Sequence, residues 1–152
     1  YDNQELKSVT IPDSVTRIGF SAFERCNNLT EIIGGNGVKN IGENALNNNW
    51  YKKQPDGVVY MGSIACGYKG EMPADGHIKI KEGTKAIAFA AFKNRSDLKS
   101  VTMPDGVIRI GSNAFEGCCD LLYARIPDSV EEVFQQDIER YRGLVNKLGL
   151  RK

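Results

Sequence analysis

The sequence predicts one β-rich solenoid, a right-handed superhelix of about five coils of 23 residues each. The first observation is a column of aliphatic residues one period apart, at Ile18, Ile41, Ile64, Ile87, Ile110 and Val133. The second is a column of Gly or Ala directly after them, and the third is an Ala-Phe or Ala-Leu pair that recurs four and five residues after the isoleucine. A coil of this size cannot bury its apolar row alone, so we expect the coils to stack.

The composition is that of a globular protein with nearly balanced charge. Of the 152 residues, 41% are hydrophobic and 26% are charged, which fits a single folded domain over residues 1–152. Twenty Lys and Arg against nineteen Asp and Glu give a net charge of +1, so no net field favours nucleic acid. No apolar run approaches the roughly 20 residues that span a bilayer. We therefore expect neither nucleic-acid binding nor membrane insertion.

Each regular coil predicts a strand, a turn, a second strand and a return segment, meaning the residues that lead to the next coil. In the first coil Leu6, Val9 and Ile11 have LxxLxL spacing, which points them inward and leaves the residues between them facing solvent. The PDS sequence that follows supplies turn chemistry, and the small column lets coils approach closely. We expect regular coils at residues 6–28, 29–51, 75–97, 98–120 and 121–134.

Residues 52–74 depart from the repeat, because their Ala and Phe positions hold Tyr68 and Lys69. The run GVVYMGSIACGY instead predicts a tight β-hairpin with Gly-Ser at its turn, inserted into the solenoid near residues 56–70. Aromatic residues are concentrated here, at Trp50, Tyr51, Tyr60 and Tyr68. Two interpretations are open: the rings cover the gap left by the missing Ala and Phe, or they form an exposed surface that stacks on a sugar.

After Val133 the repeat stops, and an amphipathic helix is predicted at residues 135–148. Its apolar stripe consists of Ile138, Tyr141, Leu144, Val145 and Leu148, and Gly149 ends it. Solenoids need a terminal cap with a polar outer face, and this helix has that form. The alternative is a basic amphipathic helix that lies on a membrane surface, because basic residues outnumber acidic ones in this stretch.

The sequence offers few residues for catalysis or metal binding. It has one histidine, His77, and four cysteines without a CxxC pair, so we expect no metal site and no cofactor. Cys66 and His77 could supply a nucleophile and a base, but no known signature surrounds either residue. The run GGNGVKNIG lacks both the third glycine of a dinucleotide-binding loop and the ending of a P-loop. We expect no enzyme activity and no catalytic residue.

The repeat copies SVTIPDSVTRIGFSAFERC and SVTMPDGVIRIGSNAFEGC resemble the BspA-like class of leucine-rich repeats. The resemblance covers about residues 6–51 and 75–133, and it implies a leucine-rich-repeat domain. It also implies a non-enzymatic protein-interaction or adhesion module of a cell-surface or secreted protein, located outside the cell. The partner it implies is a host or cell-surface protein, and the family has no catalytic motif to carry over.

The strand side of the solenoid is the surface that we expect to bind a partner, because the inward positions are committed to the core. The expected contact residues are Lys7, Thr10, Glu31, Ile33, His77, Lys79, Lys99, Thr102, Tyr123 and Arg125. A plain solvated face is the ordinary alternative for such residues. Two other functions stay open: a carbohydrate-binding module that uses Trp50, Tyr51, Tyr60 and Tyr68, and a passive structural spacer.

Overall fold

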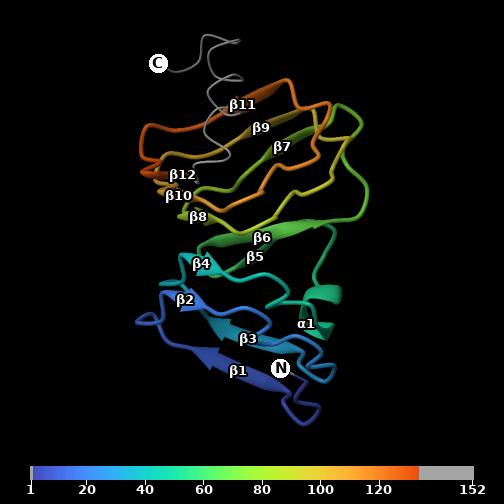
Figure 1. The fold of residues 1–152 in the computed structure, drawn as a ribbon, viewed down its shortest axis with the longest axis vertical. Helices are drawn as coiled ribbons and strands as arrows, with labels where there is room; N and C mark the ends of the chain where they lie inside the picture. The colour runs from blue at the N-terminus through green and yellow to red at the C-terminus, as the bar shows by residue number, and fades with distance from the viewer. Residues whose placement is uncertain (1, 134–152) are drawn as a thin grey trace.

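The computed structural model describes residues 2–133, which form a stack of coils with β1 at one end and β11 and β12 at the other (Figure 1). These residues make a β-solenoid of about five turns with one short helix, α1 (Asn49–Lys52). The helix expected at residues 135–148 lies outside the described residues. The strands are β1 (Ser8–Ile11), β2 (Arg17–Ile18), β3 (Glu31–Gly34), β4 (Asn40–Ile41), β5 (Gly57–Met61), β6 (Ile64–Lys69), β7 (His77–Lys79), β8 (Ala86–Ile87), β9 (Ser100–Thr102), β10 (Arg109–Ile110), β11 (Tyr123–Arg125) and β12 (Glu132–Val133).

Each regular coil gives a longer strand to one side of the stack and a two-residue strand to the other. On the first side β1 pairs with β3, and β7, β9 and β11 form a second parallel sheet. On the other side β2 pairs with β4, and β8, β10 and β12 pair in parallel with the isoleucine column in register. Both sides are therefore interrupted between the second coil and the coil that begins near residue 75.

The tight turns between the two strands of a coil recur at the same repeat position. Val15 N–H donates to Pro12 O at 3.0 Å, and Val130 N–H donates to Pro127 O at 3.2 Å. In the second coil the glycine-rich run replaces PDS, and Val38 N–H donates to Gly35 O at 3.1 Å. The run that only superficially resembled a phosphate loop is therefore the corner of a coil.

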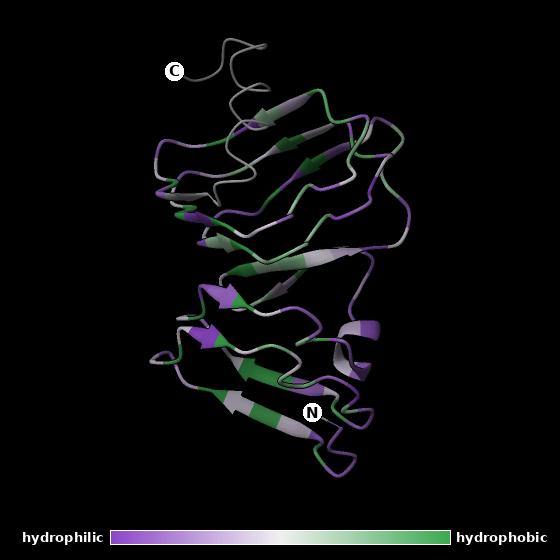
Figure 2. Ribbon diagram, viewed as in Figure 1, coloured by the Kyte–Doolittle hydropathy of each residue, from purple (hydrophilic) through white to green (hydrophobic). Residues whose placement is uncertain are grey.

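The repeat columns form the core. Ile18, Ile41, Ile64, Ile87 and Ile110 are all buried. Phe92 and Phe115, one repeat apart, stack with ring centroids 5.3 Å apart and an interplanar angle of 9°. Hydrophobic residues alternate with more polar ones along β1 in Figure 2, as expected for a strand with one face packed inward. Coil stacking thus buries the apolar rows that one coil would leave exposed.

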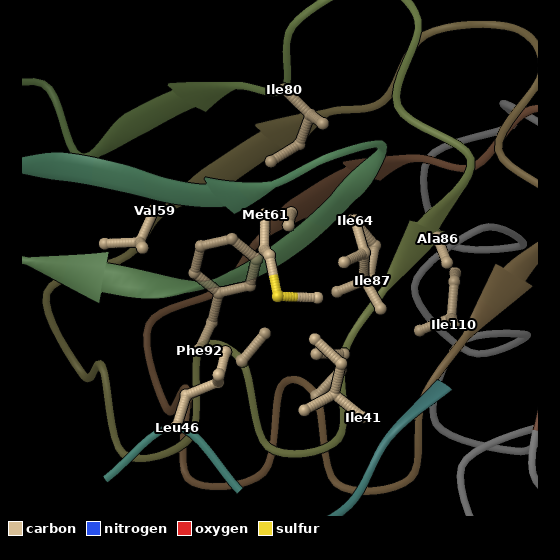
Figure 3. Close-up of a cluster of buried hydrophobic side chains, with 14 of the residues drawn as sticks. Ile41, Leu46, Val59, Met61, Ile64, Ile80, Ala86, Ile87, Phe92 and Ile110 are labelled. Carbon is tan, nitrogen blue, oxygen red and sulfur yellow. The ribbon is translucent and has the colours of Figure 1, made fainter. Parts of the chain in front are cut away.

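The third coil is replaced in the stack by two antiparallel strands, β5 and β6, connected at Gly62 and Ser63. Their inward residues join the core, and Figure 3 shows Met61 in a cluster with Ile41 and Phe92. The register differs from the repeat by one residue, because Ala65 rather than Ile64 stands opposite Ile87. The hairpin turn, and not the coil turn, sets the position of β6, which explains the shift.

Candidate functional site

The sheet of β7, β9 and β11 aligns five of the ten expected contact residues in two rows. Strand pairing is in register, so positions one repeat apart stand side by side. One row is His77, Ser100 and Tyr123, and the other is Lys79, Thr102 and Arg125. The row between them, which contains Ile78, Val101 and Ala124, is buried. The alternation of the strand therefore presents the two predicted rows outward.

Hydrogen bonds hold several side chains of these rows in place. His77 Nδ1 and Ser100 Oγ are 2.7 Å apart, so the imidazole is linked to the next coil. Arg125 donates from Nη1 to Met103 O at 2.8 Å, and its Nη2 lies 3.2 Å from the Asp105 carboxylate. Lys79 is exposed, and so is Lys99, which directly precedes β9. The rows thus combine hydrogen-bonded groups with an exposed cationic side chain.

The remaining expected contacts lie on the separate sheet of β1 and β3. Thr10 stands opposite Ile33, and Lys7 directly precedes β1. Ile33 is 49% exposed, and Lys7, Thr10 and Glu31 are exposed as well. The ten expected residues therefore fall into two groups, on either side of the hairpin, and not onto one continuous sheet.

The four aromatic residues near the hairpin do not form an open platform. Trp50 in α1 is only 6% exposed and belongs to the core, so its ring cannot stack on a ligand. The Tyr60 hydroxyl accepts a hydrogen bond from Lys81 N–H at 2.9 Å, and Lys81 Nζ lies 4.3 Å from the centroid of its ring. The Tyr68 hydroxyl donates to Glu71 O, and the Arg95 guanidinium lies 5.0 Å from its ring.

Tyr51 is half-buried and packs against the core. Desolvation raises the pKa of Tyr51 and of Tyr60. Trp50 is thus a correction to the expected aromatic surface, and the contacts of the tyrosines favour the interpretation in which the rings cover the gap in the repeat. Three asparagines, Asn47 to Asn49, precede Trp50 in the sequence, so its burial could not be told from exposure before the position of α1 was known.

The chemical groups of the described residues give little support to catalysis. Burial raises the pKa of Cys66 to about 12, so its thiol stays protonated at neutral pH and is a poor nucleophile. Cys26 and Cys118 are buried, whereas Cys119 is exposed. Over residues 2–133 no three His, Cys, Asp or Glu side chains gather where they could hold a metal ion. In the same residues no helix has the length and hydrophobicity to cross a bilayer.

Two further large apolar side chains are exposed, Leu122 at an expected outward strand position and Phe20 at a position that was not expected. Phe20 is 70% exposed and Leu122 is 61% exposed. Phe20 follows the isoleucine by two residues, a position that holds Glu43, Cys66, Phe89 and Ser112 in the other coils. The column mixes polar and apolar residues, so no signal in the sequence indicated that Phe20 is exposed. Leu122 precedes β11 and so lies beside the two rows described above.

Solved structures similar to this chain include proteins described as leucine rich. A leucine rich cell surface protein from Faecalibacterium prausnitzii A2-165 is 24% identical, with a TM-score of 0.48, over 82% of this chain and 42% of that one. The pneumococcal vaccine antigen PcpA is 21% identical, with a TM-score of 0.44, over 84% and 41%. A leucine rich repeat protein from T. pallidum is 19% identical, with a TM-score of 0.37, over 92% and 72%. This chain spans less than half of the first two structures.

No curated protein matches the sequence. The family model described as the BspA type leucine rich repeat region does match, in six copies over residues 1–54 and 76–142. The interval between the two matched ranges contains the β5–β6 hairpin. Repeat columns, stacked coils and this match over most of the chain agree, and the chain therefore belongs to the BspA-type leucine-rich-repeat family.

Proposed function

We propose that this chain is a non-enzymatic protein-interaction module of a cell-surface or secreted protein. Its family is common among surface proteins that take part in interactions. The observation that carries the proposal is the pair of aligned outward rows on β7, β9 and β11. The regular strands fix the spacing of these side chains, which favours recognition of an extended partner surface. Adhesion to a host or cell-surface protein is the role that we assign to this face.

Charge indicates the kind of protein surface that fits. Lys79 and Lys99 are exposed and basic, and Arg125 is a third basic residue, which pairs with Asp105. Among the ten expected contacts Glu31 is the acidic residue, and it lies on the other sheet. Complementary charge accelerates association and fixes orientation, so the partner surface is acidic. Tyr123 and Leu122 supply apolar contact at the edge of the basic area.

Parallel binding to arrays of extracellular-matrix proteins and of glycans tests the proposal. We expect protein ligands, and we expect Lys79→Glu with Lys99→Glu to weaken binding at least tenfold, or about 1.4 kcal/mol. The matched control is Arg17→Glu with Lys39→Glu, which reverses two exposed basic residues on the opposite side and leaves the affinity unchanged. Glycan ligands alone would favour the carbohydrate-binding alternative, and no ligand at all would favour a spacer.

A further inference from the structure

A cleft of about 450 Å³ lies where the third coil has no regular return segment. One wall is the return segment of the second coil, residues 42–47, and the other is the return segment at residues 88–94. Tyr51 and Cys66 also line it. The volume is within the range of ligand pockets, roughly 300 to 1,000 Å³. The residues that would form a return segment here in a regular coil belong instead to β6, which pairs with β5.

Return segments elsewhere in the stack are joined by main-chain hydrogen bonds. The donors stand three and five residues after the isoleucine of one coil, and the acceptors stand two and four residues after the isoleucine of the next. These bonds run from Ser21 N to Glu43 O (2.9 Å), Phe23 N to Ala45 O (3.0 Å), Ala90 N to Ser112 O (3.0 Å) and Phe92 N to Ala114 O (2.8 Å). The same ladder is therefore expected between every pair of adjacent coils.

At the cleft both halves of this ladder lack their partner. The donors are Asn44 N–H and Leu46 N–H, and the acceptors at equivalent positions are the carbonyls of Phe89, Ala91 and Lys93. Within residues 2–133 none of these five groups makes a hydrogen bond. All five residues line the cleft. Among the described residues, main-chain groups on both walls of the cleft thus lack the partners that their equivalents have elsewhere in the stack.

The small-residue column gives independent support for a missing coil. At Gly111 an added Cβ would lie 2.5 Å from Phe89 N, and at Gly42 it would lie 2.5 Å from Phe20 N. Glycine is required there because the preceding coil is so close. Ala88 occupies the same column next to the cleft and carries a Cβ. The Ala88 side chain is tolerated there because no regular return segment precedes it.

We propose that the cleft binds an extended peptide segment of a partner protein, which takes the place of the missing return segment. Backbone angles define the chemistry of that segment. Return segments place positive φ angles three and seven residues after the isoleucine, as at Asn113 (58°) and Gly117 (75°). Asn and Gly adopt such angles most readily, so the best ligand carries Asn or Gly at two positions four residues apart, although Ser21, Arg25 and Ala90 also adopt them in this chain. This site is separate from the strand rows of the proposed function.

The probe is a synthetic peptide of residues 110–117, IGSNAFEG, with the change Phe115→Gly so that binding rests on the main chain. It already has Asn and Gly at these two positions. We expect saturable binding to the full chain by calorimetry. The matched control peptide is methylated on the amide nitrogens at the positions of Asn113 and of residue 115, which removes two donors. Its affinity should be at least tenfold weaker.

Two variants of the protein test whether the peptide binds in the cleft. Asn47→Trp puts a bulky ring on an exposed wall residue and should lower the affinity at least tenfold. Glu24→Trp changes the equivalent position of the first coil, where the return segments are already joined, and should leave it unchanged. Equal binding by both peptides, or by both variants, would overturn the proposal, and so would no binding.

Amide hydrogen exchange locates the contact directly. In the chain without peptide we expect fast exchange at Asn44 and Leu46 and slow exchange at Ser21 and Phe23, whose amides are bonded. Added peptide should slow Asn44 and Leu46 alone. Slow exchange at both sites without peptide would show that the cleft is already filled. Protection that rises with protein concentration would identify a second copy as the occupant, and concentration-independent protection would identify the chain itself; either contradicts a partner peptide.

Discussion

The most constrained single residues are glycines at which two coils meet. The sequence shows only that Gly and Ala share a column, whereas the structure separates positions that require glycine from positions that do not. At Gly111 the preceding coil leaves no room for a Cβ, because an added Cβ would lie only 2.5 Å from the main-chain nitrogen of Phe89. At Gly19 nothing lies within 4 Å of the equivalent point.

We predict that Gly111→Ala destabilises the fold by about 1–3 kcal/mol, because backbone rather than a flexible side chain must move. Gly19→Ala should be neutral or stabilise by about 0.4–1 kcal/mol through the lower entropy of the unfolded chain. Urea unfolding of the two variants measures the difference. Equal effects would mean that the coils are not packed at the distances seen here.

The cysteines should differ sharply in reactivity. At pH 8 we expect a thiol reagent to label Cys119 quickly, since it is exposed, and to label Cys26 and Cys118 only on unfolding, since both are buried. Cys66 should also react slowly, because its raised pKa leaves almost no thiolate. Mass spectrometry of labelled peptides gives the order. Fast native labelling of Cys26 and Cys118 would show that their repeat position faces solvent.

The raised pKa of Cys66 makes the free energy of unfolding depend on pH in the alkaline range. Burial raises the pKa of Cys66 from 9.0 to about 12, so the folded state favours the protonated thiol. The resulting stabilisation is complete below pH 9 and is lost as the pH rises toward 12. The free energy of unfolding should therefore fall less between pH 9 and 11 in Cys66→Ala than in the parent chain. Parallel pH profiles for the two proteins would contradict this.

At the scale of the element, the coil derives its stability from its neighbours. Phe115 is 1% exposed and stacks on Phe92 of the preceding coil. We predict that Phe115→Ala costs about 3–5 kcal/mol, because it removes a buried ring and leaves a cavity. Lys99→Ala, at an exposed strand position, should change stability by less than about 0.5 kcal/mol. Chemical denaturation that shows similar small effects would contradict the assignment of the core column.

Regular coils were predictable from the sequence because residues in the same column have equivalent neighbours in every regular coil. The described isoleucines of the repeat column are buried where the period placed them, and so are the Ala-Phe positions apart from Ala22 and Phe23, which are partly buried. The outward positions of β7, β9 and β11 are at least partly exposed. The helix α1 and the burial of Trp50 were not predictable, since both belong to the coil that leaves the repeat. The cleft also depends on that coil, because the period alone implies an unbroken ladder of hydrogen bonds.

At the scale of the whole molecule, the hairpin joins two parts of the stack that the sheets leave separate. The Met61 side chain lies beside the Gly35 turn of the second coil and in the cluster with Ile64 and Phe92 (Figure 3). Ser63 Oγ donates to Asn36 O at 2.8 Å across the same junction. In repeat proteins the coupling between neighbours decides whether the array unfolds as one unit. The junction is therefore the place where cooperativity can fail.

We predict that Met61→Ala uncouples the two parts, whereas Met103→Ala does not. Both methionines are buried, at 2% and 0% exposure, so both changes should destabilise the fold by about 2–5 kcal/mol. Met103 lies within the continuous stack, and its loss should lower the stability of the whole array in one transition. Loss of Met61 should instead let the coils of residues 6–51 open at lower urea concentration than those of residues 75–133. Hydrogen exchange at Phe23 and Phe92, whose amides are bonded in the two parts, distinguishes the cases. If the two amides exchange in parallel in Met61→Ala as they do in Met103→Ala, the hairpin is not what couples the stack.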